Sequence, residues 1–239
     1  MIRNLVLLPG LDGTGKLFSS FLASLPTTFV NTTVAYPADK FHSYEDLLRI
    51  VDAAVPKEDP FVLLGESFST PIAVELAAAN PPNLVGVVLV AGFVRSPIGA
   101  WSLGARLIAN PWFFKMRLPD WTAQRALLGA NAPVTLLQTL RQALESVNPA
   151  VLSGRVQEAL NCDARSELAR TNVPMMYVQA ANDRLLSKGC FPEIKQIKPN
   201  IAFASIDGPH LLLQRAPEEA AQCVSSFVAN LSEAQKAAS

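Results

Sequence analysis

A serine on a predicted sharp turn is the first residue whose setting indicates chemistry. Residues 61–80 read FVLLGESFSTPIAVELAAAN, which predicts a buried strand, a turn that carries Ser67, and a helix. Gly65 and Ser69, two residues before and two after it, are small enough for the strand and helix backbones to pass close together. A serine hydroxyl becomes a good nucleophile when a positioned base takes its proton. An ordinary helix N-cap serine is the alternative interpretation.

The search for a base is short because the sequence has only two histidines. His42 precedes Ser43, which forms a candidate capping box with Asp46, so His42 is expected to lie at the start of a helix. His210 lies in IDGPHLLLQ, between the last predicted strand and the C-terminal helix. His210 is therefore the candidate base, and a loop histidine without a role is the alternative.

A carboxylate would complete the arrangement by fixing the histidine tautomer and stabilising its charged form. Asp183 follows the predicted strand 174–179 after three intervening residues. Asp207, three residues before His210, is the competitor, but the Gly-Pro pair that follows Asp207 favours a turn. Asp183 is the preferred candidate.

The loop LPGLDGTGKLF near the start of the chain has the composition of an anion site. Gly10 to Lys16 fits the first seven letters of the phosphate-binding pattern G-x-x-x-x-G-K-[ST]. Leu17 occupies the eighth position, where a hydroxyl would bind magnesium, and a leucine offers no oxygen donor. The sequence therefore argues against nucleotide hydrolysis and leaves the glycines and backbone N–H groups for another anion.

The elements that must position these residues alternate between short apolar runs and helical patterns. This alternation predicts an α/β fold with a mostly parallel central sheet that is flanked by helices. The predicted strands are Leu5–Leu8, Phe29–Ala35, Phe61–Leu64, Leu84–Val90, Pro174–Gln179 and Ile201–Ile206, and the predicted helices are Leu17–Leu25, Tyr44–Val55, Pro71–Ala79 and Pro217–Leu231.

One segment, residues 96–167, breaks the alternation. It contains no convincing strand and reads as short helices that are split by prolines, and all three tryptophans lie within it. An ordinary pair of crossover helices would need far fewer residues. We expect an α-helical cap inserted between two strands, with residues 1–95 and 168–239 forming the core.

Composition limits the class of protein. Half of the 239 residues are apolar, 17% are charged and the formal net charge is zero, which favours a compact globular domain and argues against a nucleic-acid binder. Three scattered cysteines indicate free thiols in a reducing compartment. The first apolar run is too short for a signal peptide, and no apolar stretch has the length of a membrane span. We expect a cytoplasmic monomer or homodimer without metal sites.

The turn GESFS resembles the nucleophile elbow G-x-S-x-G of the α/β-hydrolase family, with Ser69 in place of the second glycine. The order of candidates along the chain also matches the family order Ser…Asp…His, and the resemblance covers nearly the whole chain. It implies an α/β-hydrolase fold in which Ser67 is the nucleophile, His210 the base and Asp183 the acid.

The opening loop gains a role from the same resemblance. Pro9-Gly10-Leu11-Asp12-Gly13 resembles the family's His-Gly-x-x-Gly loop, with proline where histidine is common. By this match the backbone N–H groups of Leu11 and Phe68 form the oxyanion hole, which stabilises the negative charge that develops on a substrate carbonyl. We expect Asp12 to bind the loop's own N–H groups and Lys16 to have no catalytic role.

The match is incomplete in two respects. The G-x-G-x-S turn that commonly follows the second core strand is replaced by YPADKFHSY. The first half of the chain also resembles the hydrolase-like part of plastid acyltransferases that make phytyl esters and triacylglycerol. Those proteins carry a further domain with an H-x₄-D motif, and neither histidine here is followed by aspartate at that spacing.

The favoured function is a serine carboxylesterase that works through an acyl-enzyme and needs no metal or organic cofactor. The cap would form the pocket for a small-molecule ester, with Trp101 and Trp112 as candidate substrate contacts, although both could equally pack cap against core. The alternatives are an acyltransferase or thioesterase that uses the same triad on a fatty acyl substrate, and a ligand receptor that has borrowed the fold.

The charge of the cap raises a more specific hypothesis. Basic residues outnumber acidic ones over it, which could suit an acidic partner such as acyl carrier protein, as in the pimeloyl-carrier methyl esterases that this layout resembles. The alternative is a solvated cap surface with scattered charges. The residues concerned are Arg95, Arg106, Lys115, Arg117, Arg125 and Arg141, against Asp120 and Glu145.

Overall fold

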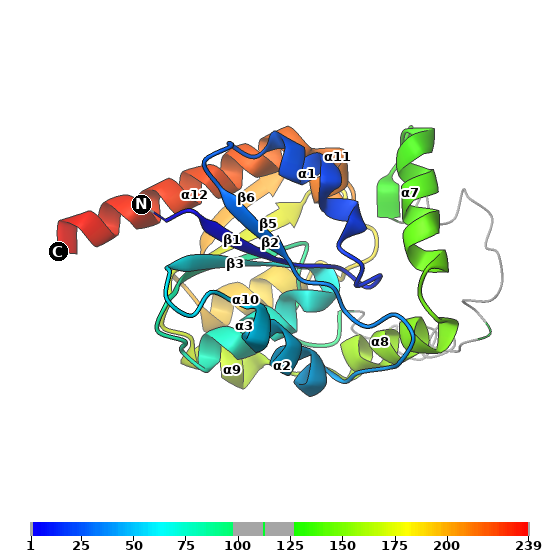
Figure 1. Cartoon of the computed structure of the whole chain (residues 1–239), viewed down its shortest axis with the longest axis horizontal. Coiled ribbons are helices and arrows are strands. Elements are labelled where there is room, and N and C mark those ends of the chain that lie inside the picture. The colour runs from blue at the N-terminus through cyan, green and yellow to red at the C-terminus, as the bar shows by residue number, and fades with distance from the viewer. Residues whose placement is uncertain (1, 98–111, 113–126, 239) are drawn as a thin grey trace.

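A computed structural model describes residues 2–97, 112 and 127–238. The described residues form a six-stranded sheet in the order β2-β1-β3-β4-β5-β6, and every neighbouring pair is parallel (Figure 1). The expected parallel sheet is confirmed, and each predicted strand end lies within two residues of the observed one. The strands are β1 (Asn4–Leu8), β2 (Val30–Thr33), β3 (Phe61–Glu66), β4 (Leu84–Val90), β5 (Met175–Ala180) and β6 (Ala202–Ile206).

Helices cover both faces of this sheet (Figure 1). Each face has its own apolar core, and every residue of β3 is buried, which explains why this strand reads as a nearly continuous apolar run. One core includes side chains of α2 (Tyr44–Ala54), α3 (Thr70–Ala78), α9 (Arg165–Arg170) and α10 (Cys190–Ile197), and the other those of α1 (Ser19–Ser24), α11 (Leu212–Arg215) and α12 (Pro217–Ala238).

The helix predictions are confirmed in outline and corrected in detail. The helix predicted over 17–25 begins as a 3₁₀ turn, η1 (Lys16–Phe18), before α1. The capping box at the start of α2 is present, since the Ser43 side chain accepts a hydrogen bond from Asp46 N–H and the Asp46 carboxylate accepts one from Ser43 N–H. None of the described helices is long and apolar enough to cross a membrane.

The segment between β4 and β5 is helical where the structure describes it. It contains α7 (Val134–Glu145), α8 (Pro149–Asn161) and α9, and Figure 1 shows α7 and α8 beyond one end of the sheet. Leu140 of α7 packs in a small apolar cluster with Leu17 and Leu211. α7 therefore lies next to the loops that follow β1 and β6, while the cap boundaries at residues 96 and 167 stay a prediction.

Candidate active site

The strand–turn–helix around Ser67 forms as predicted. β3 ends at Glu66, and Ser67 begins a short 3₁₀ turn that leads into α3. Ser67 has a φ of 49°, a left-handed conformation that is uncommon for residues other than glycine and often found at functional sites. A Cβ at Gly65 would lie 3.0 Å from both the Ala73 Cβ and the Ser69 carbonyl oxygen. The close backbone approach inferred from the sequence is therefore present.

Three of the candidate side chains meet in one hydrogen-bonded chain. Ser67 Oγ lies 2.8 Å from His210 Nε2, and His210 Nδ1 lies 2.7 Å from Asp183 Oδ2. The residues come from the carboxyl ends of β3, β5 and β6, which a parallel sheet places at one edge. This arrangement can carry a proton from the hydroxyl to the imidazole while the carboxylate holds the opposite ring nitrogen.

The two competing candidates lie outside this chain of hydrogen bonds. His42 lies just before α2, as expected of a residue at a helix start. Asp207 accepts a hydrogen bond of 2.5 Å from the Asn182 amide. The structure therefore brings together Ser67, Asp183 and His210 and leaves both alternatives apart.

The environment of Asp183 favours its ionised form. Burial raises the pKa of this carboxyl, but the hydrogen bond and charge of His210 and the backbone N–H groups of Leu186 and Leu185 together lower the pKa below its usual value. Those two N–H groups lie 3.0 Å and 2.8 Å from Asp183 Oδ1. An ionised Asp183 accepts from His210 Nδ1–H, which leaves Nε2 free to accept the Ser67 proton.

The loop after β1 is held by its own polar groups. Asp12 is buried, and its carboxylate accepts a hydrogen bond of 2.8 Å from Thr14 N–H and one of 2.5 Å from the Thr14 hydroxyl. The prediction that Asp12 serves the loop itself is confirmed. Lys16 is exposed in η1.

All carbonyl groups of residues 9–13, here called the oxyanion loop, accept hydrogen bonds. By contrast, the Leu11 N–H makes no hydrogen bond within the described part of the chain. The loop is thus fixed through its acceptors while a donor stays available for a ligand. The carbonyl partners are the Ser69 hydroxyl for Pro9, Gly13 N–H for Gly10, the Arg155 guanidinium for Leu11 and Asp12, and Tyr36 N–H for Gly13.

Ser69, the departure from the family's second glycine, has a structural use. Its hydroxyl donates to the Pro9 carbonyl and lies 2.7 Å from the Tyr36 hydroxyl. Tyr36 is buried, and this burial is the main reason that the pKa of its phenol lies well above the usual value, so it stays a neutral donor. Ser69 therefore joins the turn that carries Ser67 to the loop of residues 9–13.

Sequence reasoning missed Arg155, which comes from α8 and is 2% exposed. The signal was its spacing, because Arg155 lies one turn after Val151 and so falls on the buried side of the helix. A second missed residue is Glu66, directly before Ser67, where a carboxyl interrupts an apolar strand.

Burial raises the pKa of Glu66 to about 8, opposed by a hydrogen bond from Gln214 and reinforced by Asp12. The Gln214 amide nitrogen lies 3.1 Å from Glu66 Oε1. Gln214 Oε1 is buried without a partner in the described structure.

The predicted cap contacts are tested only in part. Trp112 is exposed over 66% of its surface, and Trp101 lies outside the described residues. Arg95 pairs with Glu193 at 3.5 Å, and Arg165 lies 3.6 Å from the same carboxylate. Of the remaining charged residues in the carrier hypothesis, Arg141 and Glu145 lie on α7, whereas Arg106, Lys115, Arg117, Asp120 and Arg125 lie outside the described residues.

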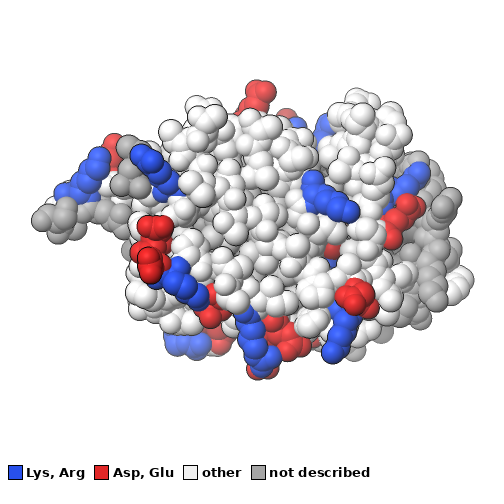
Figure 2. All heavy atoms as spheres, in the orientation of Figure 1, with Lys and Arg blue, Asp and Glu red and all other residues white. Residues whose placement is uncertain are grey.

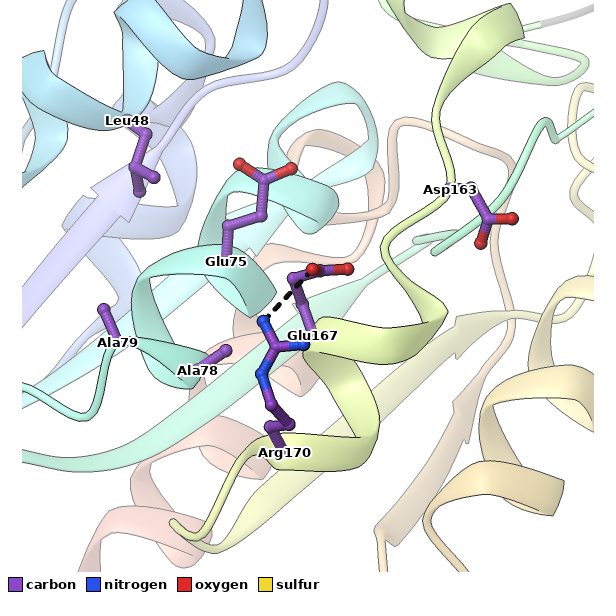
Figure 3. A pocket seen from close by; sticks show the side chains of 7 residues that line it. All are labelled: Leu48, Glu75, Ala78, Ala79, Asp163, Glu167 and Arg170. Atoms are coloured by element: carbon purple, nitrogen blue, oxygen red, sulfur yellow. Dashed lines mark hydrogen bonds and ion pairs between the residues drawn. The ribbon is translucent and has the colours of Figure 1, made fainter.

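A separate hollow of about 410 Å³ lies among α2, α3, α9 and Asp163, which precedes α9 by two residues (Figure 3). Its polar lining includes Glu75, Asp163, Glu167 and Arg170, with an ion pair of 3.1 Å between the last two. Ser67 does not line it, so it is distinct from the candidate site. No cluster of metal-ligating side chains is found in the described residues.

Comparisons with known proteins agree with this architecture. A family model described as "Alpha/beta hydrolase family" matches residues 5–222. A hydrolase from Oleispira antarctica has a similar structure, with a TM-score of 0.82, 15% identity, and coverage of 96% of this chain and 92% of that one. The sequence comparison with curated proteins found no match.

Two further solved structures are similar. An enol-lactonase from Burkholderia xenovorans LB400 gives a TM-score of 0.80 at 15% identity, over 96% of this chain and 92% of that one. A lipase-esterase related protein from Clostridium acetobutylicum gives 0.77 at 16% identity, over 94% of each chain. At these identities the likeness establishes the fold.

Proposed function

Since the chain belongs to the alpha/beta hydrolase family, we propose that it is a serine carboxylesterase. The observation that carries this proposal is the continuous hydrogen-bonded chain Ser67–His210–Asp183 at the carboxyl edge of the sheet. Its two distances, 2.8 and 2.7 Å, lie in the range needed for proton transfer and for holding the imidazole. The loop after β1 supplies the second element that acyl transfer requires, a backbone donor that has no partner among the described residues.

The proposed reaction has two halves. As Ser67 Oγ attacks the ester carbonyl carbon, His210 Nε2 takes its proton, and the N–H groups of Leu11 and Phe68 bind the oxyanion. The tetrahedral intermediate collapses, His210 returns the proton to the departing alcohol, and the acyl group remains on Ser67. Water then attacks the acyl-enzyme with His210 as base, and the acid leaves as Ser67 regains its proton.

We propose an apolar acyl or alcohol group for the substrate. Leu211, which follows His210, is buried in one cluster with Leu17, Leu128 and Leu140, so the described part of the cap presents apolar side chains beside the base. A pimeloyl methyl ester on acyl carrier protein is the specific candidate. Slow hydrolysis of this ester, unchanged when Arg141 and the other basic cap residues are reversed in charge, would remove the carrier from the proposal.

Acyl transfer is the second candidate activity, with thioester cleavage as a variant of it. Apolar side chains lie beside His210, since the buried Leu211 packs with Leu17 and Leu140, and an apolar alcohol is the acceptor that such surroundings would favour over water. A long-chain alcohol added during turnover should then yield a new ester. Constant release of free acid at all alcohol concentrations would leave hydrolysis alone.

The state of the cysteines supports a cytoplasmic location. All three are free thiols, as expected in a reducing compartment. Burial is the first cause that raises the pKa of Cys162 to about 12 and of Cys190 to about 11, so neither is a competing nucleophile at neutral pH.

A chain-length series of aryl esters tests the main proposal. The native protein should hydrolyse at least part of the series, and Ser67→Ala should lower kcat by a factor of about 10⁴ or more, because the covalent step is lost. A fluorophosphonate probe should label Ser67 in the native protein. Absence of both hydrolysis and labelling would refute the esterase assignment.

A further inference from the structure

Arg155 is a buried cation that reaches from α8 to the oxyanion loop. Its Nη1 lies 2.9 Å from the Leu11 carbonyl oxygen and 2.7 Å from that of Asp12, and its Nη2 lies 2.9 Å from that of Pro37. The guanidinium carbon also lies 5.7 Å from the centre of the Tyr36 ring. One side chain thus joins a cap helix to two neighbouring peptide groups of the loop.

The partners of this arginine are unusual for a buried charge. Burial lowers the pKa of its guanidinium, and the charge of Asp12 partly offsets this, yet no ion pair of Arg155 is found among the described residues. A buried charge is costly, and well-packed apolar residues often stabilise a fold equally well. What the guanidinium adds is rigid, forked donation to carbonyl groups.

The contacts fix both peptide planes that flank Leu11. A peptide group is planar, so holding its carbonyl also sets the direction of its N–H. The Gly10–Leu11 plane, which contains the Leu11 N–H, is held by the 3.0 Å hydrogen bond from Gly13 N–H to the Gly10 carbonyl. Arg155 holds the next plane through the Leu11 carbonyl. Together they define the direction of the proposed oxyanion donor.

Gly13 shows that loop and arginine fit each other closely. Its φ of +69° favours glycine, and a Cβ at this position would overlap the Arg155 guanidinium. The left-handed turn at Gly13 therefore brings the loop backbone directly against the side chain from α8.

From these contacts we propose that Arg155 is a positioning residue for the oxyanion hole. This inference rests on the proposed esterase function. Arg155 acts through the loop by aiming the Leu11 N–H at the carbonyl oxygen of the substrate. Arg155 also links the cap to catalysis, because a displacement of α8 would move the oxyanion loop and redirect the Leu11 N–H away from the substrate oxygen.

The test compares Arg155→Met and Arg155→Lys with the native protein, and with Arg165→Met as the matched control. Arg165 is a half-exposed arginine on helix α9 that pairs with Asp163. Three readouts are measured with the best aryl ester: kcat, KM, and the inhibition constant of a trifluoromethyl ketone, which forms a tetrahedral adduct with the serine. Circular dichroism checks the fold, and hydrogen exchange follows the amides of residues 9–13.

We expect Arg155→Met to lower kcat about 100-fold, comparable to the loss of one oxyanion donor, and to weaken ketone inhibition by a similar factor. KM should change less than threefold, and the loop amides should exchange faster. The kcat and the ketone affinity of Arg155→Lys should lie between those of the native protein and of Arg155→Met, because one ammonium group cannot reproduce the forked donation of a guanidinium. Arg165→Met should match the native protein in every readout.

Unchanged kcat and ketone affinity in a folded Arg155→Met protein would overturn the inference. So would a raised KM at unchanged kcat, which would make Arg155 a substrate-binding residue. If Arg155→Met does not fold, the kcat, KM and ketone inhibition constant of Arg155→Lys test the inference in its place. Failure of the esterase proposal is recognised separately, since the native protein itself would then show neither hydrolysis nor probe labelling.

Discussion

At the scale of single residues, the site depends on which carboxylate holds His210. Asp183 lies 2.7 Å from His210 Nδ1 and also accepts two backbone N–H groups, so its side chain has one defined orientation. Asp207 is closer to His210 in sequence but is bonded to Asn182. Because only Asp183 contacts His210 among these two carboxylates, replacing each one should affect kcat differently.

Replacing Asp183 by Asn should lower kcat by a factor of about 10³ to 10⁴, because the amide can present its NH₂ to Nδ1 and favour the wrong imidazole tautomer. Asp207→Asn is the matched control and should keep nearly full kcat. Steady-state kinetics with an aryl ester measures both. The opposite ranking would move the acid role to Asp207.

At the scale of elements, the turn between β3 and α3 requires close backbone contact. Ser67 takes a left-handed conformation there, and Gly65 leaves no room for a side chain between strand and helix. Ser69 fits in the position of the second small residue and adds a hydrogen bond to the Pro9 carbonyl. The turn is therefore held both by packing and by its connection to the oxyanion loop.

Gly65→Ala should destabilise the protein by about 1–3 kcal/mol and lower kcat, since the added methyl would press on Ala73 and the Ser69 carbonyl and shift Ser67. Gly189→Ala, where the nearest atom to the new methyl is 3.6 Å away, is the control and should change stability by less than about 0.5 kcal/mol. Urea unfolding and ester kinetics provide the two measurements. Equal stability of both variants with the native protein would contradict this account of the turn.

At the scale of the whole molecule, charged side chains are dispersed over the surface, and two carboxyl groups have raised pKa values. The face in Figure 2 shows basic and acidic residues interspersed around a largely uncharged centre. Glu66 is buried, and burial raises its pKa to about 8, whereas Glu75, in the hollow of Figure 3, is partly exposed and has its pKa raised to about 7 by burial and by neighbouring carboxylates, Glu167 first. The raised pKa values of Glu66 and Glu75 make the free energy of unfolding depend on pH.

For Glu66 the sign follows from its raised pKa. The folded state keeps this proton between pH 4.5 and about 8, where the unfolded chain releases it, so the stability that it contributes is full below pH 4.5 and lost as the pH approaches 8. Relative to Glu66→Gln, the native protein should lose on the order of 1 kcal/mol per pH unit across this window. Urea unfolding at pH 5, 7 and 9 measures the difference.

Glu75→Gln is the comparison for that experiment. Because Glu75 is partly exposed, its variant should show a smaller change of the same sign, completed near pH 7. Parallel stability curves for the native protein and Glu66→Gln would show that Glu66 is ionised throughout.

The sequence by itself determined the sheet, the turn and the order of the candidate residues. Apolar runs such as 61–64 and 84–90 predict buried parallel strands because such strands are covered on both faces, and the segment GESFS predicts a tight turn because only small residues fit beside its serine. With two histidines in the chain, the base could be narrowed to His210. The strand and turn signals each depend on residues that are neighbours in the sequence, so they can be recognised without the fold.

Only the tertiary structure decided which distant groups meet. Asp183 and Asp207 both lie near strand ends, and the fold brings Asp183 to His210. The roles of Arg155, Tyr36 and Ser69 depend on contacts between residues 33 to 144 positions apart. No periodicity encodes such contacts, because they arise when separate elements pack together, and so the means by which α8 holds the oxyanion loop became visible in the folded chain.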